Sequence, residues 1–167
     1  MRARAAAKTP IPAGTPRAQS ECLAIAYLHG KHIPCLPGKA YQVADVDILA
    51  WGCVRIEVKY STIRHYNHCF TFGLTQRQRQ RGLLADVVLL ICDYGDRQTF
   101  HLLEPDDPVF YFKDGRRKGG FTFTPGQMQQ KKHAQNRITL TQPRMDEAQD
   151  RIDLIEAARL AGAARLE

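Results

Sequence analysis

The sequence has no long hydrophobic run, and this absence limits the classes of protein that it can encode. No apolar stretch approaches the roughly 20 residues that a membrane-spanning helix requires. The longest, from Val87 to Cys92, has the length of a buried strand. The N-terminus also lacks a hydrophobic segment of the signal-peptide type. We therefore expect a protein with no membrane partner and no secretion signal.

Cysteine is sparse and odd in number, which argues against a disulfide framework. The five residues are Cys22, Cys35, Cys53, Cys69 and Cys92. Several lie in apolar segments, so we expect reduced thiols and a cytoplasmic, bacterial or phage-like setting. The segment before Glu21 is rich in Ala and Arg and has no acidic residue. An organellar transit peptide is therefore the alternative to a frayed basic tail.

Acidic residues are outnumbered, 17 Asp and Glu against 24 Lys and Arg, which gives a net charge of +7. An excess of this size points to a polyanionic partner such as nucleic acid. The chain has 167 residues, of which 44% are hydrophobic, enough for one domain with its own core. We predict a disordered basic tail over 1–14 and a single domain over 15–167.

Helix and strand signals alternate along this domain. Thr15 followed by Pro16 is typical of a helix start, and Gly30 of a helix end. Pro34 and Pro37 predict a loop, and 61–74 predicts no definite element. The predicted elements are a helix from Thr15 to Gly30, strands over about 43–50 and 53–60, a short helix over 75–81 ended by Gly82, a central buried strand within 83–94, a strand over 99–103, a hairpin joining 109–113 to 121–124 through a basic glycine-rich tip, and a helix over about 146–166.

The alternation of residue types in the first two strands predicts which side chains share a face. Residues two apart on a strand point the same way. The even-numbered positions are mainly apolar: Ala44, Val46, Ile48, Ala50, Val54, Ile56, Val58 and Tyr60. The odd-numbered positions carry the charges: Asp45, Asp47, Arg55, Glu57 and Lys59. Directly opposed residues of a hairpin also share a face, so even-numbered residues must pair with even-numbered residues. A two-residue turn at Trp51-Gly52 would pair Ala50 with Cys53 and break this rule. We expect a three-residue loop over 50–52, with Gly52 left-handed in its third position.

This register brings Asp47 close to Glu57 and Lys59, a set of groups that can hydrolyse a phosphodiester. Two carboxylates on neighbouring strands repel each other unless a cation lies between them. Mg2+ prefers such oxygen ligands and keeps several waters, which leaves room for a phosphate oxygen. Lys59 can orient the attacking water or stabilise developing charge. Asp45 is the alternative to Asp47. The simplest alternative for the whole set is an exposed polar face with a cross-strand ion pair.

These residues resemble the motif of the PD-(D/E)xK nuclease superfamily, over roughly Pro16 to Leu103. Asp47 is similar to its motif aspartate, and Glu57 with Lys59 to its Glu-x-Lys pair. Val46 stands where the name of the superfamily has proline. The resemblance implies an α/β fold with a restriction-endonuclease-like core, in which helices flank a central mixed sheet. The basic hairpin and the C-terminal helix would be additions to that core.

The same resemblance implies two further site residues. Glu21 is similar to the helix glutamate that many members of the superfamily place near the metal. Gln76, Gln78 and Gln80 fall where many members carry a polar residue at the start of the second helix, and we select Gln78 among them. The implied activity is Mg2+-dependent cleavage of double-stranded DNA, with Mn2+ able to substitute.

Basic residues outside this motif are candidates for DNA contact. They are Arg77, Arg81, Arg116, Arg117 and Lys118. Arg77 and Arg81 are four apart and share one helical face, from which they can reach phosphates. One site per chain favours a homodimer or a dimer of dimers for cutting two strands. The basic hairpin favours a site-specific, homing or restriction-like enzyme. A Holliday-junction resolvase and a non-catalytic DNA-binding protein are the alternatives.

Two groups of histidine and cysteine residues have the types found at zinc sites. The first is His29, His32 and Cys35, and the second is His65, His68 and Cys69. Structural zinc needs four converging ligands, and neither spacing matches an established pattern. We therefore expect surface histidines here.

Overall fold

The structure is a computed structural model that describes residues 16–41, 46–64, 67–129 and 139–163. The predicted tail over 1–14, the predicted N-cap Thr15 and the alternative carboxylate Asp45 lie outside these residues. So does the C-terminal end of the helix that we predicted over 146–166.

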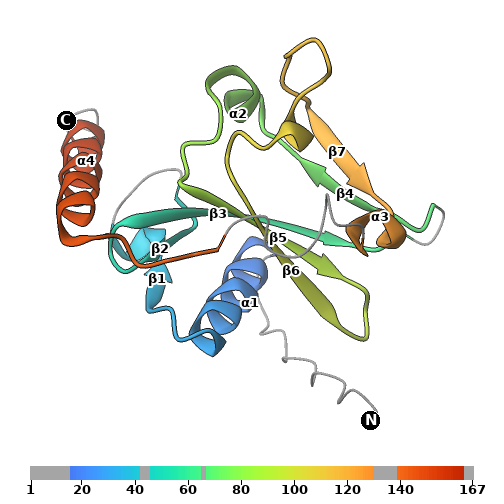
Figure 1. Ribbon diagram of the computed structural model, residues 1–167, viewed down its shortest axis with the longest axis horizontal. Coiled ribbons are helices and arrows are strands. Elements are labelled where there is room, and N and C mark those ends of the chain that lie inside the picture. Colours follow the sequence, from blue (N-terminus) through green and yellow to red (C-terminus); the bar gives the residue numbers. More distant parts are fainter. Residues whose placement is uncertain (1–15, 42–45, 65–66, 130–138, 164–167) are drawn as a thin grey trace.

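A five-stranded mixed sheet forms the centre of the fold (Figure 1). Its order is β1-β2-β3-β5-β6. β1, β2 and β3 are antiparallel neighbours, β5 runs parallel to β3, and β6 is antiparallel to β5. The strands are β1 (Cys35–Pro37), β2 (Ile48–Ala50), β3 (Val54–Thr62), β5 (Val87–Asp93) and β6 (Gln98–Leu103). The expected α/β fold with a mixed central sheet is confirmed.

β1 lies where we predicted a loop. Its residues pair with β2 from Cys35↔Ala50 to Pro37↔Ile48. We predicted a loop because proline has no backbone N–H and cannot donate a hydrogen bond to a neighbouring strand. Proline is tolerated in β1 because β1 is an edge strand, and the outer side of an edge strand needs no hydrogen bond to another strand.

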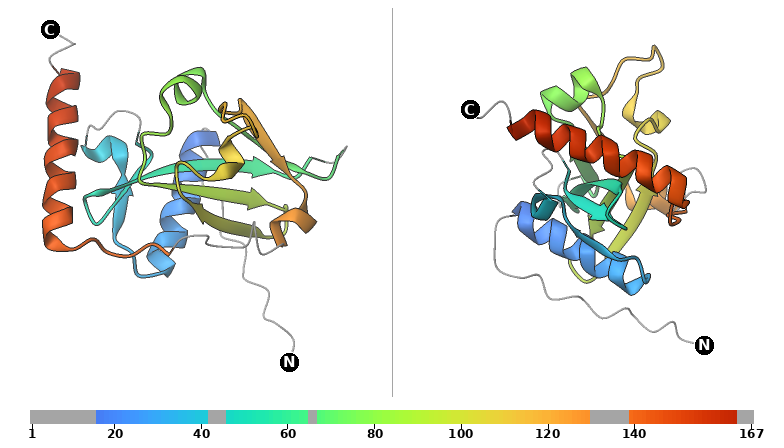
Figure 2. Two further views of the ribbon diagram at one scale, coloured as in Figure 1. Left: turned by 45° about the horizontal axis from the view of Figure 1, so that its top comes forward. Right: turned by 90° about the vertical axis from the view of Figure 1, so that its left-hand side faces the viewer.

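One face of the sheet is covered by α1 (Pro16–Gly30), whose end at Gly30 was predicted. Leu23, Ala24 and Leu28 of the helix are buried against even-numbered residues of the hairpin, such as Ile48 and Ile56. The apolar even face expected from the sequence is therefore the face that packs on α1 (Figure 2).

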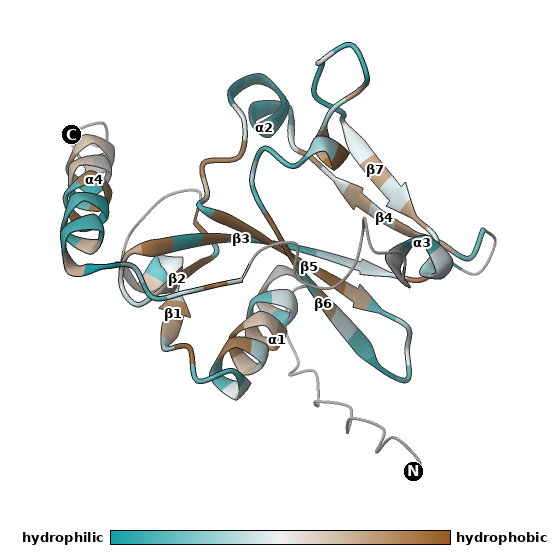
Figure 3. Ribbon diagram, in the orientation of Figure 1, coloured by the Kyte–Doolittle hydropathy of each residue, from teal (hydrophilic) through white to brown (hydrophobic). Residues whose placement is uncertain are grey.

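The other face is covered by a small second sheet and by a short helix. β4 (Phe70–Gly73) pairs antiparallel with β7 (Gly120–Phe123), and α2 (Gln76–Arg81) follows β4. β5 separates the two cores, and all seven of its residues are buried, which confirms the predicted central strand. Figure 3 shows this strand in the brown of hydrophobic residues.

The predicted hairpin between 109–113 and 121–124 is wrong. Residues 108–110 form the 3-10 helix η2 (Pro108–Phe110), and β7 pairs with β4 instead. This pairing stacks Phe72 on Phe121, with ring centroids 5.3 Å apart. It also sets Phe70 opposite Phe123. Such cross-strand aromatic pairs stabilise a sheet, and here they cover the buried side chains of β5 as well.

Two further helices, α3 (Pro125–Gln129) and α4 (Met145–Ala163), follow β7 among the described residues. α4 lies at the end of the molecule beside β2, as both views in Figure 2 show. Its Ile155 is buried with Val46 and Leu49. Within the described residues, no helix is long and apolar enough to cross a membrane. The five cysteines are free thiols, and only Cys22 is exposed.

Candidate active site

The β2–β3 hairpin has the parity that the sequence predicted, with its loop one residue further along. Ile48 pairs with Ile56 and Ala50 with Val54, so the loop is Trp51-Gly52-Cys53 rather than 50–52. The loop moves because both Trp51 (φ 50°) and Gly52 (φ 70°) are left-handed. The Cys53 N–H closes the turn on the carbonyl of Ala50 at 3.1 Å.

Moving the three-residue loop one position along the chain shifts the partner of each β2 residue by two positions on β3. Even-numbered residues therefore still pair with even-numbered residues. If the register is continued one residue beyond Ile48, Asp47 comes directly opposite Glu57. Asp47 itself lies just before β2 rather than on it. The two carboxylates are thus closer in register than we had predicted.

Asp47 is held against β3 by its own side chain. Its Oδ2 accepts a hydrogen bond of 2.8 Å from the backbone N–H of Val58, the residue between Glu57 and Lys59. Only 8% of Asp47 is exposed, which limits its freedom to turn away. A buried carboxylate is therefore fixed beside the Glu-x-Lys pair.

Glu57, Lys59 and Gln78 form a closed set of contacts. Lys59 Nζ lies 2.9 Å from Glu57 Oε1 and 2.9 Å from Gln78 Oε1. Gln78 Nε2 donates to the same Glu57 Oε1 at 2.6 Å. The side chains of Glu57 and Lys59 are only 12% and 13% exposed, so these contacts are shielded from water and weaken little with salt.

Gln78 reaches this set because of the way α2 begins. Thr75 is the N-cap, and its hydroxyl accepts from the backbone N–H of Gln78 at 3.2 Å. Gln78 Oε1 in turn accepts from the backbone N–H of Thr75 at 3.0 Å. This reciprocal capping box holds the Gln78 side chain at the helix start. Gln76 and Gln80 are exposed. The structure therefore places Gln78, of the three glutamines, at the site.

A cleft of about 290 Å³ lies over these residues. Its walls come from α1, the β2–β3 hairpin, α2 and the segment after α2. They are formed by Ser20, Asp47, Glu57, Val58, Lys59, Thr75, Arg77, Gln78, Arg81, Gly82 and Leu84. Six of the side chains selected from the sequence therefore meet in one cleft.

Glu21, which we had also selected, is buried but does not line this cleft, and Ser20 of the same helix does. Successive positions of a helix point about 100° apart, so both cannot face the cleft. No signal in the sequence singled out Ser20 or Leu84. Thr75 could have been found from the sequence, because Thr75 and Gln78 form the Thr-x-x-Gln pattern of a capping box. The same pattern distinguishes Gln78 from Gln76 and Gln80.

The five candidate DNA contacts are divided among three positions. Arg77 and Arg81 line the cleft, as their shared helical face predicted. Arg116 is largely exposed and pairs with Asp114 at 2.7 Å. Arg117 turns inward, toward backbone carbonyls of α2, and Lys118 follows it half-buried. The sequence did not predict this inward direction.

The donor groups of the cleft fit a magnesium-type ion. Asp47 and Glu57 supply carboxylate oxygens to one space, and Mg2+ is commonly held by one or two carboxylates together with waters and substrate phosphate. Among the described residues, no three His, Cys, Asp or Glu side chains converge on one point. His29 is used otherwise, with its Nε2 3.2 Å from the carbonyl of Cys35. His65 lies outside the described residues.

No protein-family model matches the sequence, and no curated protein matches it. Among solved structures, the bacterial homing endonuclease I-Ssp6803I aligns with 87% of this chain and 90% of its own. The identity is 11% and the TM-score is 0.44. A similarity this distant does not assign an activity, so function has to be inferred from the cleft itself.

Proposed function

We propose that this protein is a metal-dependent endonuclease that hydrolyses phosphodiester bonds of double-stranded DNA. The observation that carries the proposal is the convergence of Asp47, Glu57 and Lys59 in one cleft, with Gln78 bonded to both Glu57 and Lys59.

The chain's own residues can perform most of the positioning that hydrolysis needs. Asp47 and Glu57 would hold Mg2+, or Mn2+ in its place. A bound ion supplies charge stabilisation at the phosphate and lowers the pKa of a coordinated water. The Lys59 ammonium can donate to the attacking water or to a phosphate oxygen. Gln78 restrains the rotamers of both Glu57 and Lys59 before substrate arrives.

Double-stranded DNA is the substrate that the surrounding charge favours. Arg77 and Arg81 line the same cleft as the carboxylates, and the chain carries a net charge of +7. Arginine binds phosphate oxygens through two parallel N–H bonds, and it stays charged at every physiological pH. Phosphates flanking the scissile bond would therefore bind at these two residues.

We further assign the chain to the PD-(D/E)xK superfamily. The support is the order of α1, the antiparallel strands β1, β2 and β3, then β4 of the small sheet, α2, and β5 parallel to β3. Asp47 lies just before β2, and Glu57 and Lys59 lie on β3. Cleavage of both strands by one cleft per chain favours two chains acting together, so the active form that we propose is a homodimer or a dimer of dimers. Site-specific, homing or restriction-like cleavage is the form we propose.

The test uses purified protein with supercoiled plasmid, four-way junction DNA and a random DNA pool, each with Mg2+, Mn2+ or EDTA. We expect nicked and linear products from duplex DNA only with a metal. Glu57→Gln and Lys59→Ala should each abolish them while the protein still binds DNA. Cleavage confined to the junction would make the protein a resolvase. Metal-independent binding without cleavage of any substrate would make it a non-catalytic DNA-binding protein.

A further inference from the structure

The basic loop, residues 111–119, is a compact element although it is not the predicted hairpin. Tyr111 and Arg117 form a single antiparallel bridge. The N–H of Phe112 donates to the carbonyl of Arg116 at 2.8 Å, and the N–H of Gly115 to that of Phe112 at 3.0 Å. These bonds point consecutive side chains in opposite directions, with Arg116 outward and Arg117 inward.

The outward side of the basic loop has the composition of a nucleic-acid contact. Phe112 is 49% exposed, which is unusual for a phenylalanine. The Arg116 guanidinium lies 5.4 Å from its ring centre, and Lys118 Nζ lies 5.9 Å from it. Cations of this kind bind phosphates, and an exposed ring can stack on a sugar or a base.

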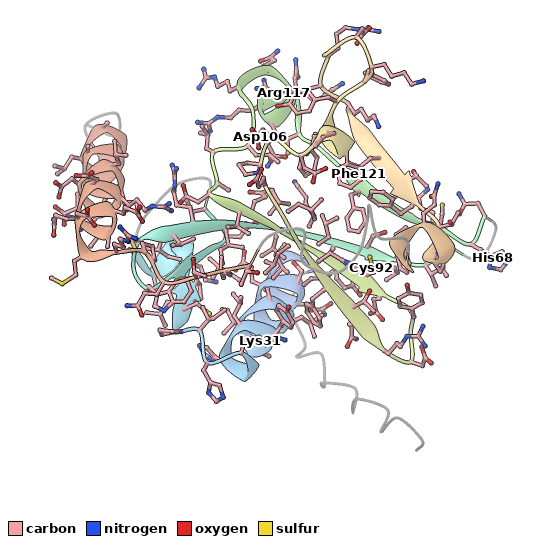
Figure 4. The ribbon with its side chains drawn as sticks, viewed as in Figure 1. Lys31, His68, Cys92, Asp106, Arg117 and Phe121 are labelled. Atoms are coloured by element: carbon pink, nitrogen blue, oxygen red, sulfur yellow. The ribbon has the colours of Figure 1, made fainter. Side chains whose placement is uncertain are left out.

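The inward side joins the basic loop to the end of α2. Arg117 Nη1 donates to the carbonyls of Gln80 and Arg79 at 3.3 and 3.4 Å. These bonds are long, so much of the attraction comes from the guanidinium charge at the negative end of the helix. The guanidinium also lies 5.8 Å from the ring centre of Tyr111. Figure 4 labels Arg117 beside α2.

Two glycines allow the basic loop and α2 to approach this closely. A Cβ at Gly82, the C-cap of α2, would lie 2.9 Å from Arg117 Nη2. A Cβ at Gly119 would lie 3.1 Å from Arg79 Nη1. The loop also holds the start of the helix, because the N–H of Leu74 donates to the carbonyl of Gly119 at 2.9 Å. Both ends of α2 are thus fixed by one loop.

This attachment matters because α2 is short and carries Gln78. A helix of six residues is far below the length at which isolated helices persist in water. Its position therefore depends on tertiary contacts, and its Gln78 holds Glu57 and Lys59 in place. A displacement of the basic loop would therefore shift α2 and the contacts of Gln78 with Glu57 and Lys59.

We infer that Arg117 is a positioning residue that couples DNA contact at the tip of the basic loop to the Gln78–Glu57–Lys59 set. DNA held by Arg116, Lys118 and Phe112 fixes the loop, and Arg117 then fixes α2. The protein would cut efficiently only where the DNA fits the loop. This inference deepens the proposed nuclease function and rests on it.

The test separates binding from the cleavage step. Arg117→Ala and Arg117→Lys are compared with Arg97→Ala, which removes an arginine stacked on Tyr94 at the distant β5–β6 turn, 4.6 Å from the ring centre. DNA affinity is measured in EDTA at several salt concentrations. The rate of a single turnover is measured in Mg2+ at saturating DNA.

Both Arg117 variants should lower the single-turnover rate by about tenfold and change the dissociation constant by less than about twofold. Lysine should not rescue, because an ammonium in the place of Nη1 has neither the Nη2 that lies beside Gly82 nor the planar group near the Tyr111 ring. Arg97→Ala should change neither quantity. If Arg117→Ala instead weakens binding, reduces the salt dependence by about one counterion and is rescued by lysine, Arg117 is a phosphate contact and the inference is wrong.

Hydrogen exchange in the free protein tests the attachment without DNA or metal. The Gly82 and Arg79 amides, bonded to the carbonyls of Gln78 and Thr75, should exchange about tenfold faster in Arg117→Ala than in wild type. Unchanged exchange would overturn the inference whether or not the protein cuts DNA. Faster exchange in a protein that cuts no substrate would overturn the proposed function, and with it the coupling, while the attachment itself would stand.

Discussion

The side-chain amide of Gln78 on α2 donates a 2.6 Å hydrogen bond to the carboxylate of Glu57 on β3. The amide oxygen of Gln78 accepts from Lys59 at 2.9 Å. One neutral residue therefore satisfies two opposite charges at once. It also caps its own helix through Thr75. Helix formation and the arrangement of the cleft thus depend on the same side chain.

Replacement of Gln78 should separate these two roles. Gln78→Glu would remove the amide donor and set a second carboxylate against Glu57, so cleavage should fall by about a hundredfold. Thr75→Ala removes only the cap and should cost about 1 kcal/mol of stability with a smaller loss of rate. The measurements are single-turnover cleavage and urea denaturation. Equal rate losses in the two variants would show that Gln78 acts through the helix alone.

Gly52 should be required for the register of the hairpin. Its φ of 70° favours glycine, so Gly52→Ala should cost about 1–2 kcal/mol in the free energy of unfolding. Gly30→Ala is the matched control, because a Cβ there meets nothing within 4 Å. Denaturant titration compares the two. A neutral Gly52→Ala would mean that the Trp51-Gly52 turn does not set the register.

His101 should make the fold sensitive to mild acid. Burial lowers its pKa to about 4, from an ordinary value of 6.5. Between these values the unfolded chain binds a proton that the folded chain does not. Stability is therefore full above pH 6.5 and falls as the pH drops toward 4, by about 1.4 kcal/mol per unit.

Denaturation midpoints measured from pH 7 to pH 4 in wild type and His101→Leu provide the check. Other titrating groups are common to both proteins, so the difference between the two curves reports on His101. We expect a flatter curve for the variant. Parallel curves would mean that His101 can become protonated in the folded state.

Asp86 should hold α4 to the sheet. Burial by itself raises the pKa of Asp86, but hydrogen bonds and charge from Arg55, with further charge from Arg151 on α4, outweigh it and leave the pKa below its usual 3.8. Such a carboxylate stabilises the fold above pH 3.8, and the contribution is lost as the pH falls through the lower folded-state pKa.

At neutral pH, Asp86→Asn should cost about 1–3 kcal/mol, because Arg55 would lose a charged acceptor that it contacts at 3.0 and 3.2 Å. Calorimetry or urea denaturation at pH 7 and pH 3 tests this. The difference in unfolding free energy between wild type and Asp86→Asn should be smaller at pH 3 than at pH 7. Asp114→Asn, at an exposed ion pair, should leave stability nearly unchanged. A deficit of the same size at pH 3 and at pH 7 would exclude the carboxylate charge as its cause.

Local patterns predicted the parts of this fold that local physics decides. The Thr15-Pro16 to Gly30 signals gave the extent of α1, although Thr15 itself lies outside the described residues. Thr75 and Gly82 marked both ends of α2. The alternation of apolar and charged residues predicted that Asp47, Glu57 and Lys59 lie together. The loop was off by one residue because Trp51 adopts a left-handed conformation that its residue type disfavours.

Pairings between distant segments could not be predicted in this way. β1 was missed because its prolines are acceptable only at an edge, and the edge exists only once the sheet has formed. β7 was assigned to the wrong partner because the choice between 109–113 and β4 depends on which aromatic side chains cover β5.

The sequence by itself determined that two carboxylates and a lysine share one face of a hairpin, since side-chain alternation permits no other arrangement with a buried apolar face. Only the tertiary structure decided what stands opposite them. The packing of α2 over that face selected Gln78 among three glutamines, and the position of α1 on the opposite face placed Ser20, rather than Glu21, at the edge of the cleft. It also turned Arg117 inward. Helix orientation depends on contacts with distant strands and loops, and a local pattern does not encode them.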